Sequence, residues 1–198
     1  GAYSSKPNAD DVSLNEELSR ILPIIDLLIN HFPDIILSVD TFRAEVAKQC
    51  LEKGAALIND ISAGHLDKNM LDIIATFNVP YIMMHSRGNP KTMQNKEYLQ
   101  YDNLLVNVVQ SLQTRITALK KLGVKDIIID PGIGFAKDLV QNLKLIKNLA
   151  FFKELECPIL IGLSRKSFIR KALNVESTEA LNGTTVMHTV SLLNGANI

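Results

Sequence analysis

Polar side chains stand at the end of each short apolar run in the chain. The runs occupy positions 34–40, 55–62, 80–86, 126–132 and 158–164. Their terminal polar residues are, in chain order, Asp40, Asn59, Asp60, His85, Asp130, Ser164, Arg165 and Lys166. A single aspartate in such a place can simply cap the following helix. Repetition at five strand ends instead indicates a ligand pocket, because the carboxyl ends of parallel strands converge on one edge of a sheet.

The carboxylates and the amide of this set suit a flat heterocycle that carries several N–H groups. A carboxylate facing an amino-imino edge makes a paired, charge-assisted hydrogen bond. Phe135 and Met84 are candidates for the two faces of such a ring. The segment 164–167 supplies two cations and two hydroxyls beside an expected helix start, which favours an anion there, and Lys6 adds a further cation. No Cys/His cluster has zinc spacing, so a zinc site is not indicated.

The turn after Asp130 contains Pro131, Gly132 and Gly134. Glycine adopts backbone conformations with positive φ and lets the chain pass close to a neighbouring group. We therefore expect this turn to bend sharply and to lie against the ligand.

The elements that must position these groups follow from two alternating periods. The apolar runs are continuous, as expected of strands covered on both faces. Helical spacing fills the intervals at 14–25, 41–54, 68–78, 98–123, 138–149 and 178–193, and Ser13 with Glu16 predicts a capping box. Strict alternation of strand and helix predicts an α/β fold with a parallel sheet. An open doubly wound sheet and a (β/α)8 barrel both satisfy this order, and no G-x-G-x-x-G follows any run.

Composition limits the class of protein. Lys plus Arg number 21 and Asp plus Glu number 21, so the 198-residue chain has zero net charge. This balance argues against a nucleic-acid or membrane-surface role, and the length fits a single domain spanning 1–198. Cys50 and Cys157 lie far apart in core-like patterns, so no disulfide is expected. No apolar run reaches membrane-spanning length and no signal peptide is visible, so we expect a cytoplasmic protein.

Six blocks of the sequence together resemble the dihydropteroate synthase family, the folate-pathway enzymes that sulfonamides target. The blocks are "SSKPNA" (4–9), "SVDT" (38–41), "INDIS" (58–62), "MHSRGNPKTMQ" (84–94), "IDPGIGFAK" (129–137) and "GLSRKSFI" (162–169). They occur in one order, and the resemblance runs from the first residue to the last.

The resemblance implies a (β/α)8 barrel of which this chain covers strands 3–7 and the start of strand 8. It implies condensation of 6-hydroxymethyl-7,8-dihydropterin diphosphate with p-aminobenzoate, giving 7,8-dihydropteroate and pyrophosphate, with Mg2+ as cofactor. It also implies a homodimer, with the late helices as the candidate interface. In the family a first-strand asparagine loop binds Mg2+ and an Arg-Val-His motif on the eighth strand binds the diphosphate. Both lie outside this sequence, so we expect the chain alone to be inactive.

The resemblance also assigns the site residues. The pterin contacts that it implies are Asp40, Asn59, Ile61, Met84, Asp130, Phe135, Gly162 and Lys166, with Asp40, Asp130 and Lys166 as the catalytic set. The p-aminobenzoate contacts are Ser5, Pro7, Ser167 and the aliphatic stem of Lys166. Arg165 matches a site arginine of less defined role. Lys6 stands where the family usually has arginine, so the charge is kept but the bidentate fork is lost.

Alternative functions and simpler interpretations of single residues stay open. A pterin-binding methyltransferase domain shares a related barrel but works with a corrinoid partner, and the "SRKSF" block argues against it. A non-catalytic pterin-binding module is a second alternative. An aldolase with Lys166 as Schiff base is disfavoured, because Arg165 adjoins it without an obvious hydrophobic shell. His85 is also interpretable as a packing histidine, Asp60 as the cap of a turn, and Met83 as core.

Overall fold

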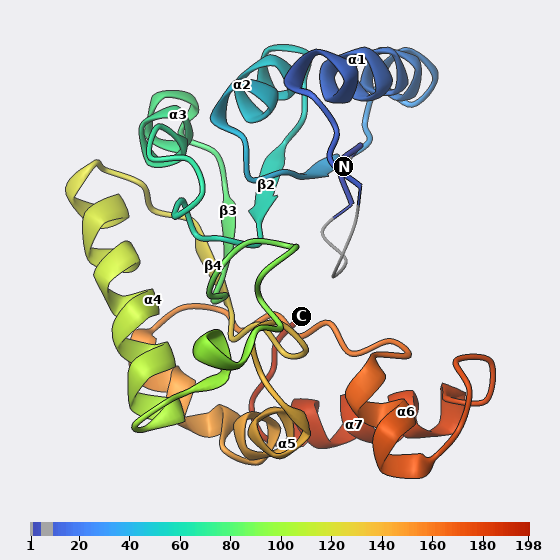
Figure 1. Ribbon diagram of the computed structural model, residues 1–198. Coiled ribbons are helices and arrows are strands. Elements are labelled where there is room, and N and C mark those ends of the chain that lie inside the picture. Colours follow the sequence, from blue (N-terminus) through green and yellow to red (C-terminus); the bar gives the residue numbers. More distant parts are fainter. Residues whose placement is uncertain (1, 5–9) are drawn as a thin grey trace.

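The computed structural model describes residues 2–4 and 10–198, and its centre is one parallel sheet (Figure 1). The four strands are β1 (Ser38–Asp40), β2 (Leu57–Asp60), β3 (Tyr81–Met84) and β4 (Ile127–Asp130). Their order across the sheet is β1-β2-β3-β4, so each strand pairs with its neighbour in the sequence. Every strand after the first is reached through a helical crossover, as the alternation of periods predicts.

The helices form an arc around the strands (Figure 1). The α-helices are α1 (Leu14–His31), α2 (Ala44–Glu52), α3 (Met70–Phe77), α4 (Leu104–Lys121), α5 (Leu139–Lys147), α6 (Ser167–Leu173) and α7 (Leu181–Leu193). Two 3-10 helices, η1 (Lys96–Leu99) and η2 (Leu149–Leu155), complete the described elements. Among these, no helix is both long and apolar enough to cross a membrane.

One face of the sheet carries the core. Residues on this outer face pack with the helices in a single cluster of buried side chains, which includes Val39, Ile58, Tyr81, Met83, Ile127 and Ile129. Because successive side chains of a strand point to opposite faces, the residues between them belong to the inner face. Met83 is fully buried in the outer-face cluster, as expected of a core methionine.

The run at 158–164 is paired over a shorter distance than its length predicts. It makes one parallel bridge, between Ile129 of β4 and Ile159. The Ile129 N–H donates to the carbonyl oxygen of Pro158 at 2.9 Å, and the Leu160 N–H donates to that of Ile129 at 2.8 Å. The predicted fifth strand is therefore right in place and direction but wrong in extent, because only its first half pairs with β4.

The starts of α1 and α5 follow the capping rules, but the Glu16 side chain of α1 has a different partner from the one predicted. The Ser13 hydroxyl accepts from the Glu16 N–H at 3.2 Å, as predicted, but the Glu16 carboxylate pairs with Arg20 on the next turn. A reciprocal capping box occurs instead at α5, between Asp138 and Gln141. Glutamate at the third helical position is thus drawn to arginine one turn later, where opposite charges meet at the i, i+4 spacing.

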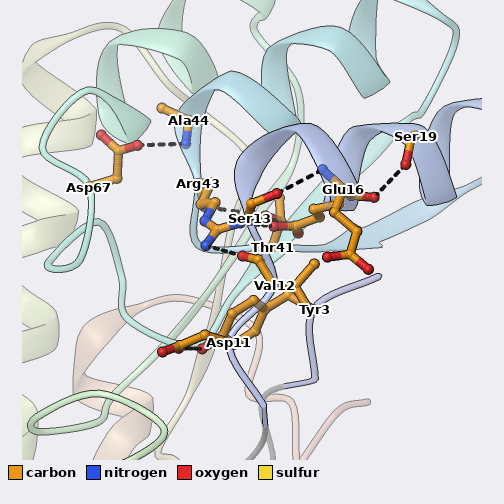
Figure 2. A network of polar contacts seen from close by, with 11 residues as sticks. Tyr3, Asp11, Val12, Ser13, Glu16, Ser19, Thr41, Arg43, Ala44 and Asp67 are labelled. Carbon is orange, nitrogen blue, oxygen red and sulfur yellow. Dashed lines mark hydrogen bonds and ion pairs between the residues drawn. The ribbon is translucent and has the colours of Figure 1, made fainter.

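Arg43 ties the end of β1 to two other segments (Figure 2). Its guanidinium donates to the Glu17 carboxylate of α1 at 2.8 Å and to the carbonyl oxygen of Val12 at 2.7 Å. Glu17 is fully buried, and the Thr41 hydroxyl donates to it at 3.2 Å. A buried carboxylate requires such partners, because an unpaired charge is costly to remove from water. This network fixes the turn that directly follows Asp40.

Asp67 holds the start of α2 from a different loop (Figure 2). Its carboxylate accepts a hydrogen bond from the Ala44 N–H at 2.8 Å, whereas the residue in the usual capping place, Arg43, provides no side-chain cap. An acidic group at a helix N-terminus satisfies a free N–H and complements the helix dipole. The loops after β1 and β2 are therefore fastened to each other beside the carboxyl edge of the sheet.

Candidate active site

The register of the sheet brings four of the predicted site residues to one face. Asp40 pairs with Asn59 across β1 and β2, and Met84 pairs with Asp130 across β3 and β4. Asn59 pairs in turn with Ile82, which precedes Met84 by two residues and therefore shares its face. All of these residues stand on the inner face near the carboxyl ends of the strands. The predicted gathering of polar groups at this edge is present.

Asp130 is the buried acid of the inner face. Its side chain is 8% exposed, and one carboxylate oxygen accepts a hydrogen bond from the Gly132 N–H at 2.7 Å. Burial raises the pKa of Asp130, while the charge of Lys166 and the Gly132 N–H act in the opposite direction. Burial likewise lowers the pKa of Lys166, against the attraction of Asp130. The two groups thus stabilise each other's charged forms in a poorly hydrated place.

Lys166 crosses the turn that follows β4. Its ammonium donates to the carbonyl oxygen of Ile133 and lies 4.7 Å from the centre of the Phe135 ring. A Cβ added to Gly134 would stand 2.9 Å from Cδ of Lys166, so the lysine stem rests directly on this glycine. Glycine is required at this position both by that contact and by its φ of +85°.

Gly132 approaches the backbone of β3, not the ligand side that the sequence predicts. It has a φ of +74°, and an added Cβ would overlap the carbonyl oxygen of His85. The His85 N–H donates to the carbonyl oxygen of Asp130 at 2.9 Å, which explains why the turn runs so close to the end of β3. The tight approach therefore joins two strand ends and aims the Asp130 side chain.

Asp60, which follows Asn59 at the end of β2, faces the outer side. Asp60 is fully buried and accepts hydrogen bonds from the Ser62 and Gly64 N–H groups and from the Tyr81 hydroxyl, each at 2.7 Å. Its carboxylate is thus occupied in holding the β2–α3 turn, as the simpler interpretation of the sequence has it. His85, one residue beyond Met84, is buried, and its Nδ1 lies 3.1 Å from the ammonium nitrogen of Lys137.

Asp40 and Asn59 complete the inner edge and are both half-buried. Burial raises the pKa of Asp40, and the nearby charges of Asp60 and Glu17 add to that effect. Ile61 is buried in the turn that follows β2. An acid with a raised pKa beside an amide offers both acceptors and donors to a polar heterocycle.

The residues expected to meet the second substrate lie around the start of α6. Arg165 and Ser167 are exposed, Gly162 is exposed beside them, and Lys166 is the residue before the helix. The helix has only seven residues, so the anion-binding effect predicted for its N-terminus is small. The remaining predicted contacts, Ser5, Lys6 and Pro7, lie outside the described residues.

A cavity of about 610 Å3 lies between the 86–98 loop and α4. Ile61 and His85 contribute to its wall, whereas Asp40, Asn59, Asp130 and Lys166 do not. The end of β3 therefore separates this cavity from the inner face, on which Asp40, Asn59 and Asp130 lie.

Metal ligands do not gather in the described part of the chain. Among residues 2–4 and 10–198, no three His, Cys, Asp or Glu side chains are grouped so that they could hold a metal ion. The Mg2+ implied by the resemblance therefore has no site of three protein ligands here, and we assign it no step.

One buried residue near the site was missed from the sequence. Lys137, the last residue of the "IDPGIGFAK" block, is 3% exposed and lies within 3.1 Å of Nδ1 of His85. Its signal was a lysine that closes a glycine-rich turn directly before a helix, where a cation is unfavourable for the helix dipole.

Comparison with known proteins identifies relatives of this chain. The family model described as "Pterin binding enzyme" matches residues 1–198. A dihydropteroate synthase of Clostridium beijerinckii is 42% identical over 198 residues, which cover 99% of this chain and 70% of that protein. The chain belongs to the dihydropteroate synthase family. A mitochondrial folate synthesis bifunctional protein of Arabidopsis thaliana is 40% identical over 213 residues, and the chain spans 38% of its length.

A solved structure agrees with the family at the level of the fold. The dihydropteroate synthase of Clostridium difficile, crystallised in the presence of pteroic acid, superposes with a TM-score of 0.90 at 33% identity. The match covers 99% of this chain and 72% of that one. This likeness and the parallel sheet confirm the predicted α/β barrel class, of which the described strands form a part.

Proposed function

We propose that the chain carries the pterin-binding centre of a dihydropteroate synthase. The reaction condenses 6-hydroxymethyl-7,8-dihydropterin diphosphate with p-aminobenzoate to give 7,8-dihydropteroate and pyrophosphate. The observation that carries the proposal is that Asp40, Asn59 and Asp130 share the inner face near the carboxyl ends of the strands, with Lys166 beside Asp130. The enzymes of the same family to which the chain is similar bear this activity in their names.

The side-chain acceptors of Asp40, Asn59 and Asp130 recognise the pterin ring. Its amino-imino edge faces the Asp130 carboxylate, which the Gly132 N–H holds in place at 2.7 Å. A paired hydrogen bond of this kind is charge-assisted and gains strength from burial. Asp40 and Asn59 take the remaining polar atoms of the ring. Met84, Ile61, Phe135 and Gly162 form its apolar surroundings.

Bond breaking at the pterin methylene gives the acids their catalytic role. The C–O bond to the diphosphate breaks, and pyrophosphate leaves with the electron pair. The amine nitrogen of p-aminobenzoate then forms the new C–N bond and loses a proton. Positive charge develops on the ring in this step, and the preorganised carboxylates of Asp130 and Asp40 stabilise it.

The chain is further proposed to form a homodimer through its last helices. On α7, the apolar side chains of Leu181, Val186, Leu192 and Leu193 are between 55% and 83% exposed. Leu173 at the end of α6 is 51% exposed beside them. Such apolar surface is typical of an interface between subunits.

Lys166 and Ser167 are expected to divide the two substrates between them. Lys166→Ala removes both the ammonium beside Asp130 and the stem on which the p-aminobenzoate ring rests, so affinity for both ligands falls about 10-fold or more. Ser167→Ala removes only an exposed hydroxyl, so p-aminobenzoate binding weakens while pterin binding keeps its wild-type value. Calorimetric titration of each variant with each ligand measures the effects. Equal small losses for both ligands in both variants would remove the proposed division.

The proposed function is tested by ordered titration of residues 1–198. We expect 6-hydroxymethyl-7,8-dihydropterin diphosphate to bind, and p-aminobenzoate to bind once pyrophosphate and a pterin are present. Turnover is then measured after residues 1–198 replace the matching region of the Clostridium beijerinckii enzyme. A chain that binds pterin but never p-aminobenzoate is a pterin-binding module or methyltransferase domain, and a chain that binds neither contradicts the proposal.

A further inference from the structure

Lys137 is a buried cation to which the reaction described above gives no part. Its ammonium nitrogen lies 2.9 Å from the carbonyl oxygen of Phe135, 3.0 Å from that of Gly132, 3.1 Å from Nδ1 of His85 and 3.4 Å from the carbonyl oxygen of His85. The side chain is 3% exposed. Burying an ammonium is costly unless hydrogen bonds replace its water shell. These four contacts supply that replacement.

Only the charged form of Lys137 has enough donors to serve three of these four acceptors at once. An ammonium has three N–H donors, whereas the neutral amine has two donors and a lone pair. His85 fits the role of acceptor, because burial and the charges of Lys137 and Arg87 hold its pKa well below the ordinary value. Its ring is therefore neutral, and Nδ1 accepts when the proton is on Nε2. Loss of the Lys137 proton leaves one buried acceptor without its partner.

Gly132 and Phe135, whose carbonyl oxygens accept from Lys137, belong to the turn that positions Asp130. Gly132 donates its N–H to Asp130 at 2.7 Å, and Phe135 carries the ring beneath the Lys166 ammonium. Gly132, Gly134 and Ala136 all have positive φ, so this turn makes no regular backbone ladder. Lys137 provides the internal connection that such a turn otherwise lacks.

The surroundings close over the ammonium. The Tyr101 hydroxyl donates to the carbonyl oxygen of Ala136 at 2.9 Å, and its ring lies 6.2 Å from the ring of His85. Arg87 stacks on the other part of the cover, 3.8 Å from the Tyr101 ring centre. Lys137 is thus 3% exposed beneath this cover, while His85 and Arg87 also line the cavity beside the 86–98 loop.

We propose that Lys137 is a positioning residue whose charged ammonium clamps the Gly132–Phe135 turn to His85 and so holds Asp130 and Phe135 in place for the pterin ring. The inference rests on the proposed function of the same site. Lys137 acts through Asp130 and Phe135 and touches no substrate atom.

The clamp has a definite dependence on pH. Burial lowers the pKa of Lys137 to about 7, the charges of Lys166 and Arg87 act in the same direction, and Asp130 opposes them. His85 is neutral throughout this range for the reason given above. As pH rises through 7, the ammonium loses its proton and the turn loosens, so pterin affinity falls.

Protein stability moves the opposite way, which separates the clamp from general unfolding. In the unfolded chain a lysine has a pKa of about 10.4, so above pH 7 the unfolded state binds more protons than the folded state. The contribution of Lys137 to the free energy of unfolding therefore increases between pH 7 and about 10.4. A loss of pterin affinity in this range, without a loss of stability, is the signature of the clamp.

The test measures binding of 6-hydroxymethyl-7,8-dihydropterin diphosphate to residues 1–198 between pH 6 and 8.5. Wild-type affinity is expected to fall about 10-fold across this range, the effect of losing one charged hydrogen bond. Lys137→Met, which keeps the length without the charge, should bind about 10-fold more weakly at pH 6 and show no such fall. Lys137→Met with wild-type affinity at pH 6, or with the wild-type pH dependence, overturns the inference.

Two further measurements keep the result interpretable. His85→Asn retains an acceptor near the position of Nδ1 but cannot titrate, so the fall in affinity persists if Lys137 causes it and disappears if His85 does. Thermal unfolding identifies a Lys137→Met protein that does not fold, in which case His85→Asn and the wild type decide between the two groups. Absence of binding by the wild type at every pH contradicts the proposed function itself.

Discussion

Asp130→Asn is expected to weaken pterin binding about 30- to 1000-fold, which corresponds to about 2–4 kcal/mol for a broken buried, charged hydrogen bond. Asparagine keeps the size of the side chain but loses the charge and places an N–H2 donor where an acceptor is needed. The effect is large because the acid is 8% exposed and water cannot replace it. Calorimetric titration with 6-hydroxymethyl-7,8-dihydropterin diphosphate measures the change.

The stability of the Asp130→Asn protein is expected to stay close to the wild-type value. Burial raises the pKa of Asp130, so the folded chain already holds this charge at a cost that the amide avoids. Asp60→Asn is the matched comparison, because Asp60 accepts four hydrogen bonds from its own chain on the outer face. We expect it to lower the melting temperature and to leave pterin binding nearly unchanged. The reverse pattern in the two variants would exchange their roles.

Gly132→Ala is expected to lower the free energy of unfolding by about 2–5 kcal/mol and to abolish measurable pterin binding. An alanine at a φ of +74° costs about 1–2 kcal/mol in backbone strain. The added Cβ also meets the His85 carbonyl oxygen, a backbone atom that cannot rotate away, and such overlap costs about 1–3 kcal/mol. Relief requires the turn to leave β3, which carries Asp130 with it.

Gly123→Ala isolates the strain from the overlap. Gly123 has a φ of +89° after α4, and an added Cβ there meets no atom within 4 Å. We expect this variant to lose about 1–2 kcal/mol of stability and to bind pterin normally. Urea unfolding and calorimetry of the two alanine variants give the difference. If both variants behave alike, the close approach at Gly132 contributes nothing to the site.

The sequence predicted the strand ends well because two local signals agree there. A continuous apolar run marks a strand covered on both faces, and a polar residue after it marks the carboxyl edge. This signal predicted Asp40, Asn59 and Asp130 at one edge, where the register has them, but it also predicted Asp60, which faces the core. The α/β class follows from the same alternation, whereas the order β1-β2-β3-β4 does not, because an open doubly wound sheet also satisfies that alternation.

Other features depend on contacts that no local pattern contains. The pairing of β2 with β1 and β3 decides whether Asn59 or Asp60 faces the ligand. A shift of the register by one residue would turn each side chain of β2 to the opposite face. The run at 158–164 is shorter as a strand than it is as an apolar segment, because pairing depends on its neighbour. Lys137 looks like a surface lysine at a helix start until His85, from a distant strand, is seen beside it.

The alternation of faces along the strands has a consequence for how the length of the chain can vary among its relatives. Inserting or deleting one residue within β2 would exchange Asn59 with Asp60, bringing the support of Tyr81 into the pocket and sending a pocket residue into the core. The helix-to-strand connections at the opposite edge, such as 78–80 and 122–126, carry no site residue. The Arabidopsis alignment extends over 213 positions against 198 here, so gaps separate the two chains. Length differences of this kind are expected to accumulate in those connections among relatives. The number of residues in each strand is expected to stay the same.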